Sequence, residues 1–378
     1  MSRKRLNDRF GMRSGGIALL LLVVLSGVSG CGSSGSSASG GGVDTSLPAI
    51  VVTSVLDEAM PASGTVTLRS ALASAASRQR ITFDEALSGM TINLTLVGDE
   101  HTTLVGEVMG FDEANNISFL VGYHNRDYGR SALFADKDVV IDASNLGDGI
   151  TLNWDGATSA RVLAVAGNLT LTNVSITGGN AFFDTAADVG QHPDDAQTST
   201  LARGAGIAVW GIATLTDCAI YDNHAMGDDA DTSRDGGAYG GGVYADTVVM
   251  DRCVVSGNTV SGGGAAGGGV FSVGGRDTGS NISSISRSAI TGNRIAGLFA
   301  YGAGVYSDGG GIGRASRLHV ENSTIARNLV EPPALPPFLS GLLDLGYWRG
   351  GGLYMSIGYL QVQASTLVEN PVCGKPRT

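Results

Sequence analysis

Two of the four cysteines stand at a spacing that could support chemistry. Cys218 and Cys253 lie 35 residues apart (253 − 218) in two similar segments. A nucleophilic cysteine needs a histidine to accept its proton, and no spacing brings one of the five histidines to either residue. We therefore predict a structural pair of stacked thiols. A disulfide is the less favoured alternative, because its Cβ atoms lie about 3.8 Å apart whereas neighbouring strands are about 4.8 Å apart.

Two acidic insertions carry the other side chains capable of chemistry. Dense carboxylates can bind calcium, or serve as general acid and base in a polysaccharide-active enzyme. Neither the EF-hand spacing nor the Gly-Gly-x-Gly-x-Asp repeat is present, so we predict solvated loops, no metal site and no cofactor, with calcium as the alternative. For an enzyme, the best candidates are Asp228, Asp229 and Arg234. The acidic residues are Asp184, Asp188, Asp194 and Asp195 in the first insertion, and Asp228, Asp229, Asp231 and Asp235 in the second.

A glycine-rich element of the form Gly-[Ala/Gly]-Gly-aliphatic occurs five times. One copy alone would suggest a phosphate-binding loop. Five copies without a following Lys-Ser/Thr indicate instead tight corners and close packing between successive turns of the chain. The aromatic residue behind four of the copies predicts a stacked column, with a carbohydrate-binding stripe as the alternative. These residues are Tyr244, Phe271, Tyr306 and Tyr354.

The elements that position these residues belong to a repeat. Each copy ends in asparagine and carries Cys or Ser five positions earlier, and three successive intervals, 253 − 218, 288 − 253 and 323 − 288, equal 35. Apolar and polar residues largely alternate in each copy, which is typical of a half-buried strand. The asparagines are Asn223, Asn258, Asn293, Asn328 and Asn370, and an earlier copy aligns to end at Asn180.

A unit of this size cannot bury its own apolar face, so the copies have to stack. If each copy is one turn of a coil, equivalent strands pair in parallel and identical side chains form ladders. Each ladder Asn then lies at a bend, where it tolerates left-handed backbone angles and bonds the Asn one turn along. We predict an all-β right-handed parallel β-helix over residues 146–378, preceded by a cap module and the first coils in residues 49–145.

Residues 1–30 have the basic start and short apolar run of an export signal. The signal ends in Val-Ser-Gly followed by Cys31, which resembles the lipoprotein box of bacteria. That resemblance implies cleavage before Cys31, acylation of this cysteine and a membrane partner reached through its lipid. Gly32 at the next position implies the outer membrane or cell surface. Residues 31–48 are a flexible Gly/Ser-rich tether.

Residues 66–72, Val-Thr-Leu-Arg-Ser-Ala-Leu, resemble the Cys-Ser-Leu-Arg-Glu-Ala module that precedes β-helices in bacterial surface proteins akin to the polymorphic outer-membrane proteins. Leu, Arg and Ala are kept, whereas Cys, Ser and Glu are not. The apolar spacing in residues 68–76 predicts a short amphipathic helix that plugs the open end of the coil. For Arg69 we predict a capping ion pair with Asp57 or Asp84.

Two further segments depart from the repeat. Residues 99–136 read as an irregular, polar and aromatic elaboration of the first coils, and His101 and His124 within them lack a metal-binding spacing. The insertion behind Glu331 is rich in Pro, Leu and aromatic residues, so it must fold back on the coil or meet a partner. Its candidate ligand- or partner-binding residues are Phe338, Tyr347 and Trp348.

The net charge excludes one class of partner. Without the five basic residues and one acidic residue of the leader, 24 − 5 = 19 Lys and Arg face 35 − 1 = 34 Asp and Glu, a net charge of −15. Such a chain has no electrostatic surface for nucleic acid. We predict a non-catalytic, lipid-anchored surface protein for adhesion or for binding envelope or extracellular polymers, with a glycan or a surface protein as ligand. A polysaccharide lyase or glycoside hydrolase on the same fold is the alternative.

Overall fold

The part of the chain that can be described forms one unit. The computed structural model describes residues 42–99, 103–112, 117–127, 129–182, 202–227, 237–274, 282–309, 316–332 and 347–373. The predicted export signal, Cys31, His101, both acidic insertions and Phe338 lie outside these residues.

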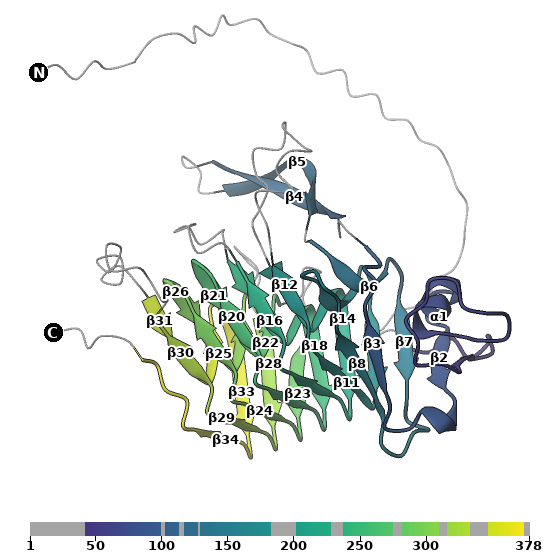
Figure 1. Ribbon diagram of the computed structural model, residues 1–378. Helices are drawn as coiled ribbons and strands as arrows, with labels where there is room; N and C mark the ends of the chain where they lie inside the picture. Colours follow the sequence, from purple (N-terminus) through teal and green to yellow (C-terminus); the bar gives the residue numbers. More distant parts are fainter. Residues whose placement is uncertain are drawn as a thin grey trace, which may run out of the picture. The chain divides into compact units, whose positions relative to one another are not determined.

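Four β-sheets form the coil, and successive turns of the chain add strands to them (Figure 1). Sheet 1 has fourteen strands. Nine of them follow in the order β1 (Ile50–Val52), β2 (Arg80–Phe83), β7 (Val139–Asp142), β10 (Leu169–Thr172), β14 (Ile207–Thr216), β18 (Val243–Asp251), β22 (Val270–Ser272), β27 (Val305–Ser307) and β32 (Leu353–Met355). The others are β6 (Ser131–Ala135), β9 (Arg161–Val165), β23 (Ser283–Ser286), β28 (Ser316–Glu321) and β33 (Gly358–Gln363).

The other three sheets of the coil are shorter. Sheet 2 consists of β3 (Thr91–Leu94), β8 (Ile150–Trp154), β11 (Val174–Thr177), β15 (Ala219–Tyr221), β19 (Val254–Ser256), β24 (Ala289–Thr291), β29 (Thr324–Ala326) and β34 (Thr366–Val368). Sheet 3 consists of β12 (Asn180–Phe182), β16 (His224–Met226), β20 (Thr259–Ser261), β25 (Arg294–Ala296) and β30 (Leu329–Glu331). Sheet 4 consists of β13 (Ala202–Arg203), β17 (Ala238–Tyr239), β21 (Gly264–Ala266), β26 (Phe299–Tyr301) and β31 (Tyr347–Arg349).

The strands pair in parallel and in the register of the repeat. In sheet 2, Val255 pairs with Ile220 of the coil before it and with Ile290 of the coil after it. All three side chains are buried in one continuous core, which also contains Leu215 and Met250 of sheet 1. This arrangement confirms the predicted all-β parallel β-helix.

The predicted asparagine ladder is present in the interior. The Asn258 side chain donates to Asn293 Oδ1 at 3.0 Å, and its own Oδ1 accepts from the side chain of Asn223 at 2.9 Å. Asn293, Asn328 and Asn370 continue the same chain of amides. Each bond joins one coil to the next, so the ladder satisfies polar groups that would otherwise be buried without partners.

Two details of the predicted ladder are wrong. The left-handed backbone belongs to the residue before each ladder Asn, as in Asp222 at φ 53° and Gly257 at φ 64°. The ladder Asn itself does not adopt the left-handed conformation, and its amide points into the coil. The alignment to Asn180 is also displaced by one residue, because Asn180 pairs with His224 and leaves Gly179 opposite Asn223. Gly179 has no side chain to offer, so its N–H donates to the Asn223 amide at 2.9 Å.

The glycine corners lie against the asparagine ladder. A Cβ atom on Gly242 would sit 3.0 Å from Asn258 Nδ2, and one on Gly269 would sit 2.9 Å from Asn293 Nδ2. The glycine bend and the asparagine bend therefore meet inside each coil, and we call this narrow place the waist. A side chain at the third glycine has no room there. The waist separates the main core from a second, alanine-rich core between sheets 3 and 4, which contains Ala238, Val260 and Ala265.

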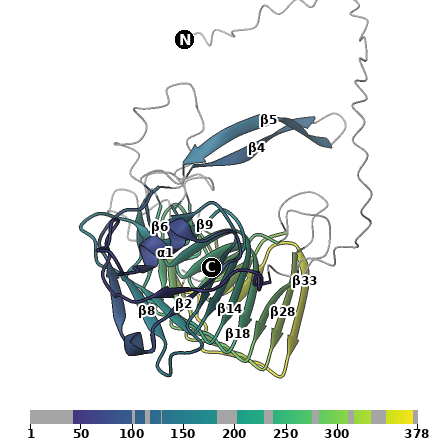
Figure 2. The same ribbon diagram turned by 90° about the vertical axis from the view of Figure 1, so that its right-hand side faces the viewer.

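Helix α1 (Leu68–Ser74) lies at the start of the coil (Figure 2). Its N-terminus is closed by a capping box between Thr67 and Ser70. Its apolar face, including Leu68 and Leu72, is buried in the main core, as predicted. Arg69 forms a bidentate pair with Asp57 at 2.7 and 2.9 Å and also donates to two backbone carbonyls. This confirms the predicted ion pair of the cap. A 3-10 turn at Glu85–Leu87 comes after β2 in the chain.

The prediction of an irregular segment at residues 99–136 is wrong. Strands β4 (Thr103–Asp112) and β5 (Ile117–Asp127) form an antiparallel two-stranded sheet of their own, and β6 follows. An antiparallel pair needs only local register, so it forms without the repeat that defines the coil. Two apolar runs around Glu-Ala-Asn-Asn, residues 113–116, are the sequence signal for this hairpin.

The last turn of the coil exposes positions that are interior elsewhere. Leu318 of β28 is 2% exposed, whereas Leu360, its partner in β33, is 45% exposed. Val320 and its partner Val362 show the same change, from 0% to 41%. The apolar side chains of one coil are therefore shielded from solvent by the next coil, and not by other residues of the same coil.

We expect Arg69→Ala to lower the free energy of unfolding by about 3–5 kcal/mol, because Asp57 would stay buried without its cation. Urea denaturation followed by circular dichroism measures this loss. The matched control is Arg80→Ala, which removes the 3.6 Å surface pair with Asp142 and should cost less than about 1 kcal/mol. Equal losses in the two variants would contradict a buried capping role for Arg69.

Candidate functional site

A column of aromatic side chains runs along the outer face of sheet 1. Tyr244 is the second residue of β18, and its neighbours Val243 and Ala245 belong to the main core. Because side chains alternate along a strand, Tyr244 points away from that core. The same position in β22, β27 and β32 holds Phe271, Tyr306 and Tyr354.

The rings of this column stack on one another. Centroid separations are 5.3 Å for Tyr244 and Phe271, 4.8 Å for Phe271 and Tyr306, and 5.6 Å for Tyr306 and Tyr354. The planes of these pairs are within 14°, 18° and 19° of parallel. The predicted stacked column is thus confirmed, and the ring faces inside it are occupied by other rings.

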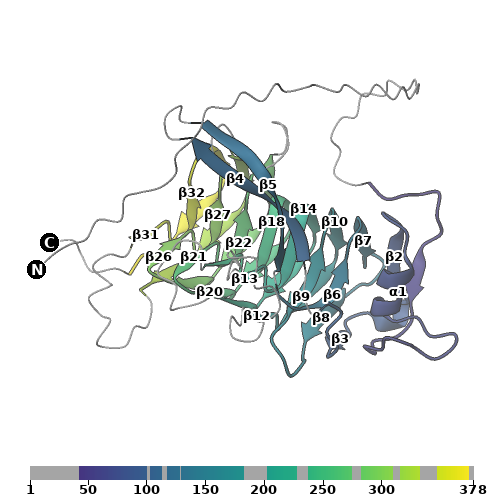
Figure 3. The ribbon, with the colours of Figure 1, turned by 90° about the horizontal axis from the view of Figure 1, so that it is seen from above.

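Sheet 4 lies beside sheet 1 (Figure 3). Its aromatic residues add a second row of rings to the column. Tyr239 tilts onto Phe271 at 5.0 Å, and Tyr301 tilts onto Tyr354 at 5.1 Å. Phe299 and Tyr347, on the same outer face of sheet 4, stack on each other at 5.9 Å. We call this surface the aromatic crease; it comprises Tyr239, Tyr244, Phe271, Phe299, Tyr301, Tyr306, Tyr347 and Tyr354.

The crease is closed at one end and open at the other. Tyr244 is 2% exposed, and the Arg203 guanidinium lies over its ring at 5.0 Å and donates to its hydroxyl. Tyr301, Tyr306 and Tyr354 are half-buried, and Tyr347 is 43% exposed. A ligand can therefore reach the rings of the last two coils but not those at the Tyr244 end.

Polar groups border the open part of the crease. Arg349 is exposed in β31 and pairs in register with Tyr301. On the other side, the Ser356 hydroxyl donates to Asp308 at 2.5 Å. Burial, and then the nearby Asp308 carboxylate, raise the pKa of the Tyr306 hydroxyl well above its usual range. The Tyr306 hydroxyl accordingly keeps its proton to a higher pH than an exposed tyrosine does.

The two described residues of the predicted ligand-binding insertion have different positions. Tyr347 lies in the crease, on the outer face of β31. Trp348 pairs with Ala300, packs against the second core and donates its ring N–H to Gly297 at 2.8 Å. Its indole is thus engaged inside the coil, and Tyr347 is the residue available to a ligand.

The sequence prediction missed the row contributed by sheet 4. Tyr239 and Tyr301 directly precede the glycine corner, in Tyr239-Gly240 and Tyr301-Gly302. The corner reverses the chain so sharply that the residues on both sides of it face one another. In the sequence, such a crease is indicated by an aromatic residue directly before the glycines together with a second aromatic residue shortly after them, repeated from copy to copy.

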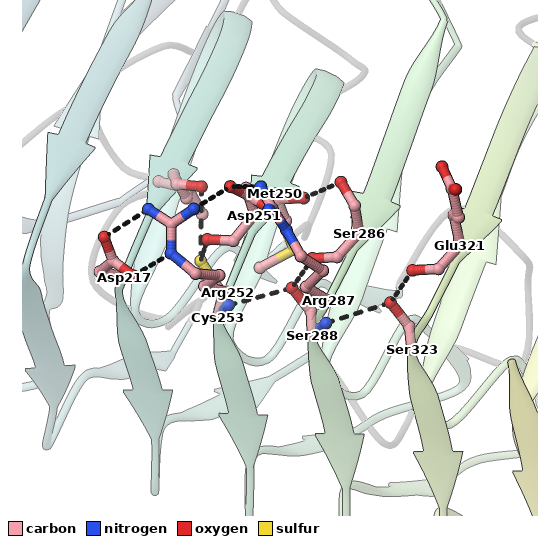
Figure 4. Close-up of polar contacts among 11 residues, drawn as sticks. Asp217, Met250, Asp251, Arg252, Cys253, Ser286, Arg287, Ser288, Glu321 and Ser323 are labelled. Carbon is pink, nitrogen blue, oxygen red and sulfur yellow. Dashed lines mark hydrogen bonds and ion pairs between the residues drawn. The ribbon is translucent and has the colours of Figure 1, made fainter. Parts of the chain in front are cut away.

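The corner that carries Cys218 and Cys253 is a structural ladder. Arg252 binds Asp217 of the preceding coil at 2.6 and 2.7 Å, and Arg287 binds Asp251 in the same way (Figure 4). The hydrogen bond from Arg252, and to a smaller extent its charge, lower the pKa of Asp217. The corner thus joins neighbouring coils through charged pairs at the surface.

Comparisons with protein-family models, curated proteins and solved structures find no match for this chain. Within the described ranges, no three His, Cys, Asp or Glu side chains gather as they would around a metal ion. None of the helices described here has the length and apolar character needed to cross a membrane.

We expect the free energy of unfolding to fall at alkaline pH, in part because of Tyr306. Because the folded-state pKa is raised above the unfolded value of about 10, stability is fully present below about pH 10 and falls as pH rises beyond it. Urea unfolding at increasing pH should show a shallower decline for Tyr306→Phe than for the wild type. Tyr359→Phe is the control, since Tyr359 is 70% exposed and should keep the wild-type slope. Parallel curves for Tyr306→Phe and wild type would contradict this assignment.

Proposed function

We propose that this chain is an exported, non-catalytic β-helix protein that binds an extended, neutral glycan in the open part of the aromatic crease. The observation that carries the proposal is the alignment of aromatic rings with the coil axis. Successive coils repeat at about 4.8 Å, so the last two coils present ring edges at a regular interval to an extended polymer.

The chemistry of the crease suits a sugar polymer. Sugar rings have apolar C–H faces that pack on aromatic groups, and hydroxyls that need hydrogen-bond partners. Tyr347 and Tyr354 offer aromatic surface at the open end, while Ser356 and Asp308 offer hydroxyl and carboxylate groups beside it. A ligand would lie across the edges of the stacked rings, with its hydroxyls turned to these polar groups.

The charge near the open end favours a neutral ligand. Arg349 stands on one side of the crease and Asp308 on the other, so the local charges are balanced. The remainder of the chain after the leader carries a net charge of −15 (19 − 34), which repels anionic polymers. A polyanion would therefore be repelled by the chain as a whole and would gain little from the crease.

We also propose a cellular location for the protein, which rests on the resemblances at its N-terminus. Acylation of Cys31 would anchor the chain to the outer membrane, and the Gly/Ser-rich tether would let the coil stand off the bilayer. The module similar to Cys-Ser-Leu-Arg-Glu-Ala, with its helix α1, would serve as the cap of the β-helix. Adhesion to extracellular or envelope polymers is the role that fits this placement.

We expect Tyr347→Ala and Tyr301→Ala to weaken glycan binding about fivefold each, because each removes one aromatic contact worth about 1 kcal/mol. The full chain is first screened on an array of neutral and acidic glycans, and the best neutral ligand is then titrated calorimetrically. Tyr359→Ala, a tyrosine outside the crease, is the matched control and should bind like wild type. Absence of any neutral ligand, or unchanged binding by both crease variants, would disprove the proposal. Release of reducing or unsaturated ends during incubation would favour the enzyme alternative.

For the anchor, we expect Cys31→Ala to move the protein from the membrane fraction to the soluble fraction of a Gram-negative host, and to abolish incorporation of labelled fatty acid. Cys373→Ala is the matched control, because it removes an exposed cysteine outside the leader and should leave both properties intact. Membrane partition of Cys31→Ala equal to that of wild type would refute lipidation as the anchor.

A further inference from the structure

Cys218 and Cys253 occupy the same corner in two neighbouring coils. Each follows a left-handed residue, Asp217 at φ 55° and Arg252 at φ 53°. The pairing of Ala219 with Val254 places the two cysteines directly opposite, and the Val254 N–H donates to the Cys218 carbonyl at 2.8 Å. Neighbouring parallel strands put the Cα atoms about 4.8 Å apart, within the range of about 4.4–6.8 Å found in disulfides.

The same corner holds serine in the following coils. The Ser288 hydroxyl donates to the Ser286 carbonyl at 2.7 Å and accepts from the Cys253 N–H at 3.0 Å. The Cys218 thiol imitates this pattern with a longer contact, 3.2 Å to the Thr216 carbonyl. Thiols are weak donors and acceptors compared with hydroxyls, so hydrogen bonding alone does not favour sulfur at these two positions. Two adjacent cysteines differ from two serines in being able to form a covalent bond.

Both cysteines lie inside the main core. Cys218 and Cys253 are 2% and 1% exposed, and both are free thiols in the structure. An external disulfide cannot reach sulfurs that are this deeply buried, so the folded coil resists oxidation. A bond between these residues has to form before the coil closes over them.

We propose that Cys218 and Cys253 are a disulfide-forming pair that joins two neighbouring coils when the chain folds in an oxidising compartment. The oxidant is a small or protein disulfide. One cysteine thiolate attacks it to form a mixed disulfide and release one thiol; the second cysteine thiolate then attacks the first cysteine's sulfur and releases the other thiol. The two electrons and two protons of the pair end on the two thiols released from the oxidant.

The disulfide would be a covalent link between two neighbouring coils. Its formation requires the Cβ atoms to approach from the strand spacing to about 3.8 Å, a shift of about 1 Å that a corner accommodates more readily than a strand centre. It closes a loop of 35 residues (253 − 218), which restricts the unfolded chain and stabilises the coil. Once folded, the bond is shielded from reductants by the same burial that shields the thiols.

The experiment refolds the full chain with Cys31→Ser and Cys373→Ser, so that the pair supplies the remaining thiols. The reduced, unfolded protein is diluted into reduced and oxidised glutathione, then denatured and alkylated. We expect a mass lower by two hydrogen atoms, no alkylation at either cysteine, and a Tm several degrees above that of the reduced form. Alkylation of both cysteines after oxidative refolding would overturn the proposal.

Two controls separate the bond from other effects of oxidation. Cys253→Ser, which copies the serine of the next coil, should fold and show the same Tm with and without oxidant. The folded, reduced protein should react with glutathione at least tenfold more slowly than the refolding chain. A redox-dependent Tm in Cys253→Ser, or equal rates of oxidation before and after folding, would contradict the assignment to a pair closed during folding.

Discussion

The fold depends on one contact, the bond from each buried asparagine amide to the asparagine of the next coil. Asn223, Asn258 and Asn293 each bridge two coils in this way, at 2.9 and 3.0 Å. Inside the coil such amides have no water to replace a lost partner, so the bonds fix the register together with the buried apolar side chains. A slip by one residue would bury unpaired amides and expose a row of aliphatic side chains at the same time.

The same ladder determines the shape of each coil. Gly242 and Gly269 approach the asparagine amides so closely that a Cβ atom would collide with them. The waist formed there divides the interior into two cores and folds sheet 4 toward sheet 1 on the outside. Aromatic residues on both sides of the glycines consequently meet in one crease. A packing requirement of the interior thus creates the surface that we propose binds a glycan.

Contacts between coils differ in energy with their burial. The Arg69–Asp57 pair closes the first coil with side chains 13% and 2% exposed, whereas Arg252 and Asp217 are 45% and 42% exposed at the outer corner. Solvent screens the outer pairs, so they align the coils without contributing much stability. The apolar rungs, the amides and the capping helix hold the coil together, which leaves the outer positions free to vary from one coil to the next.

Much of the fold was predictable from the sequence because the repeat is periodic. The interval of 35 residues, the alternation of apolar residues and the repeated Asn and Gly require stacked parallel strands, and the spacing from Leu68 onward requires a helix. The tertiary structure alone decided the rest. Whether Tyr347 faces outward and Trp348 inward depends on the register of β31 with β26, and the left-handed residue before each Asn depends on where the amide finds its partner. Such choices are made between coils, where the pattern within one copy carries no information.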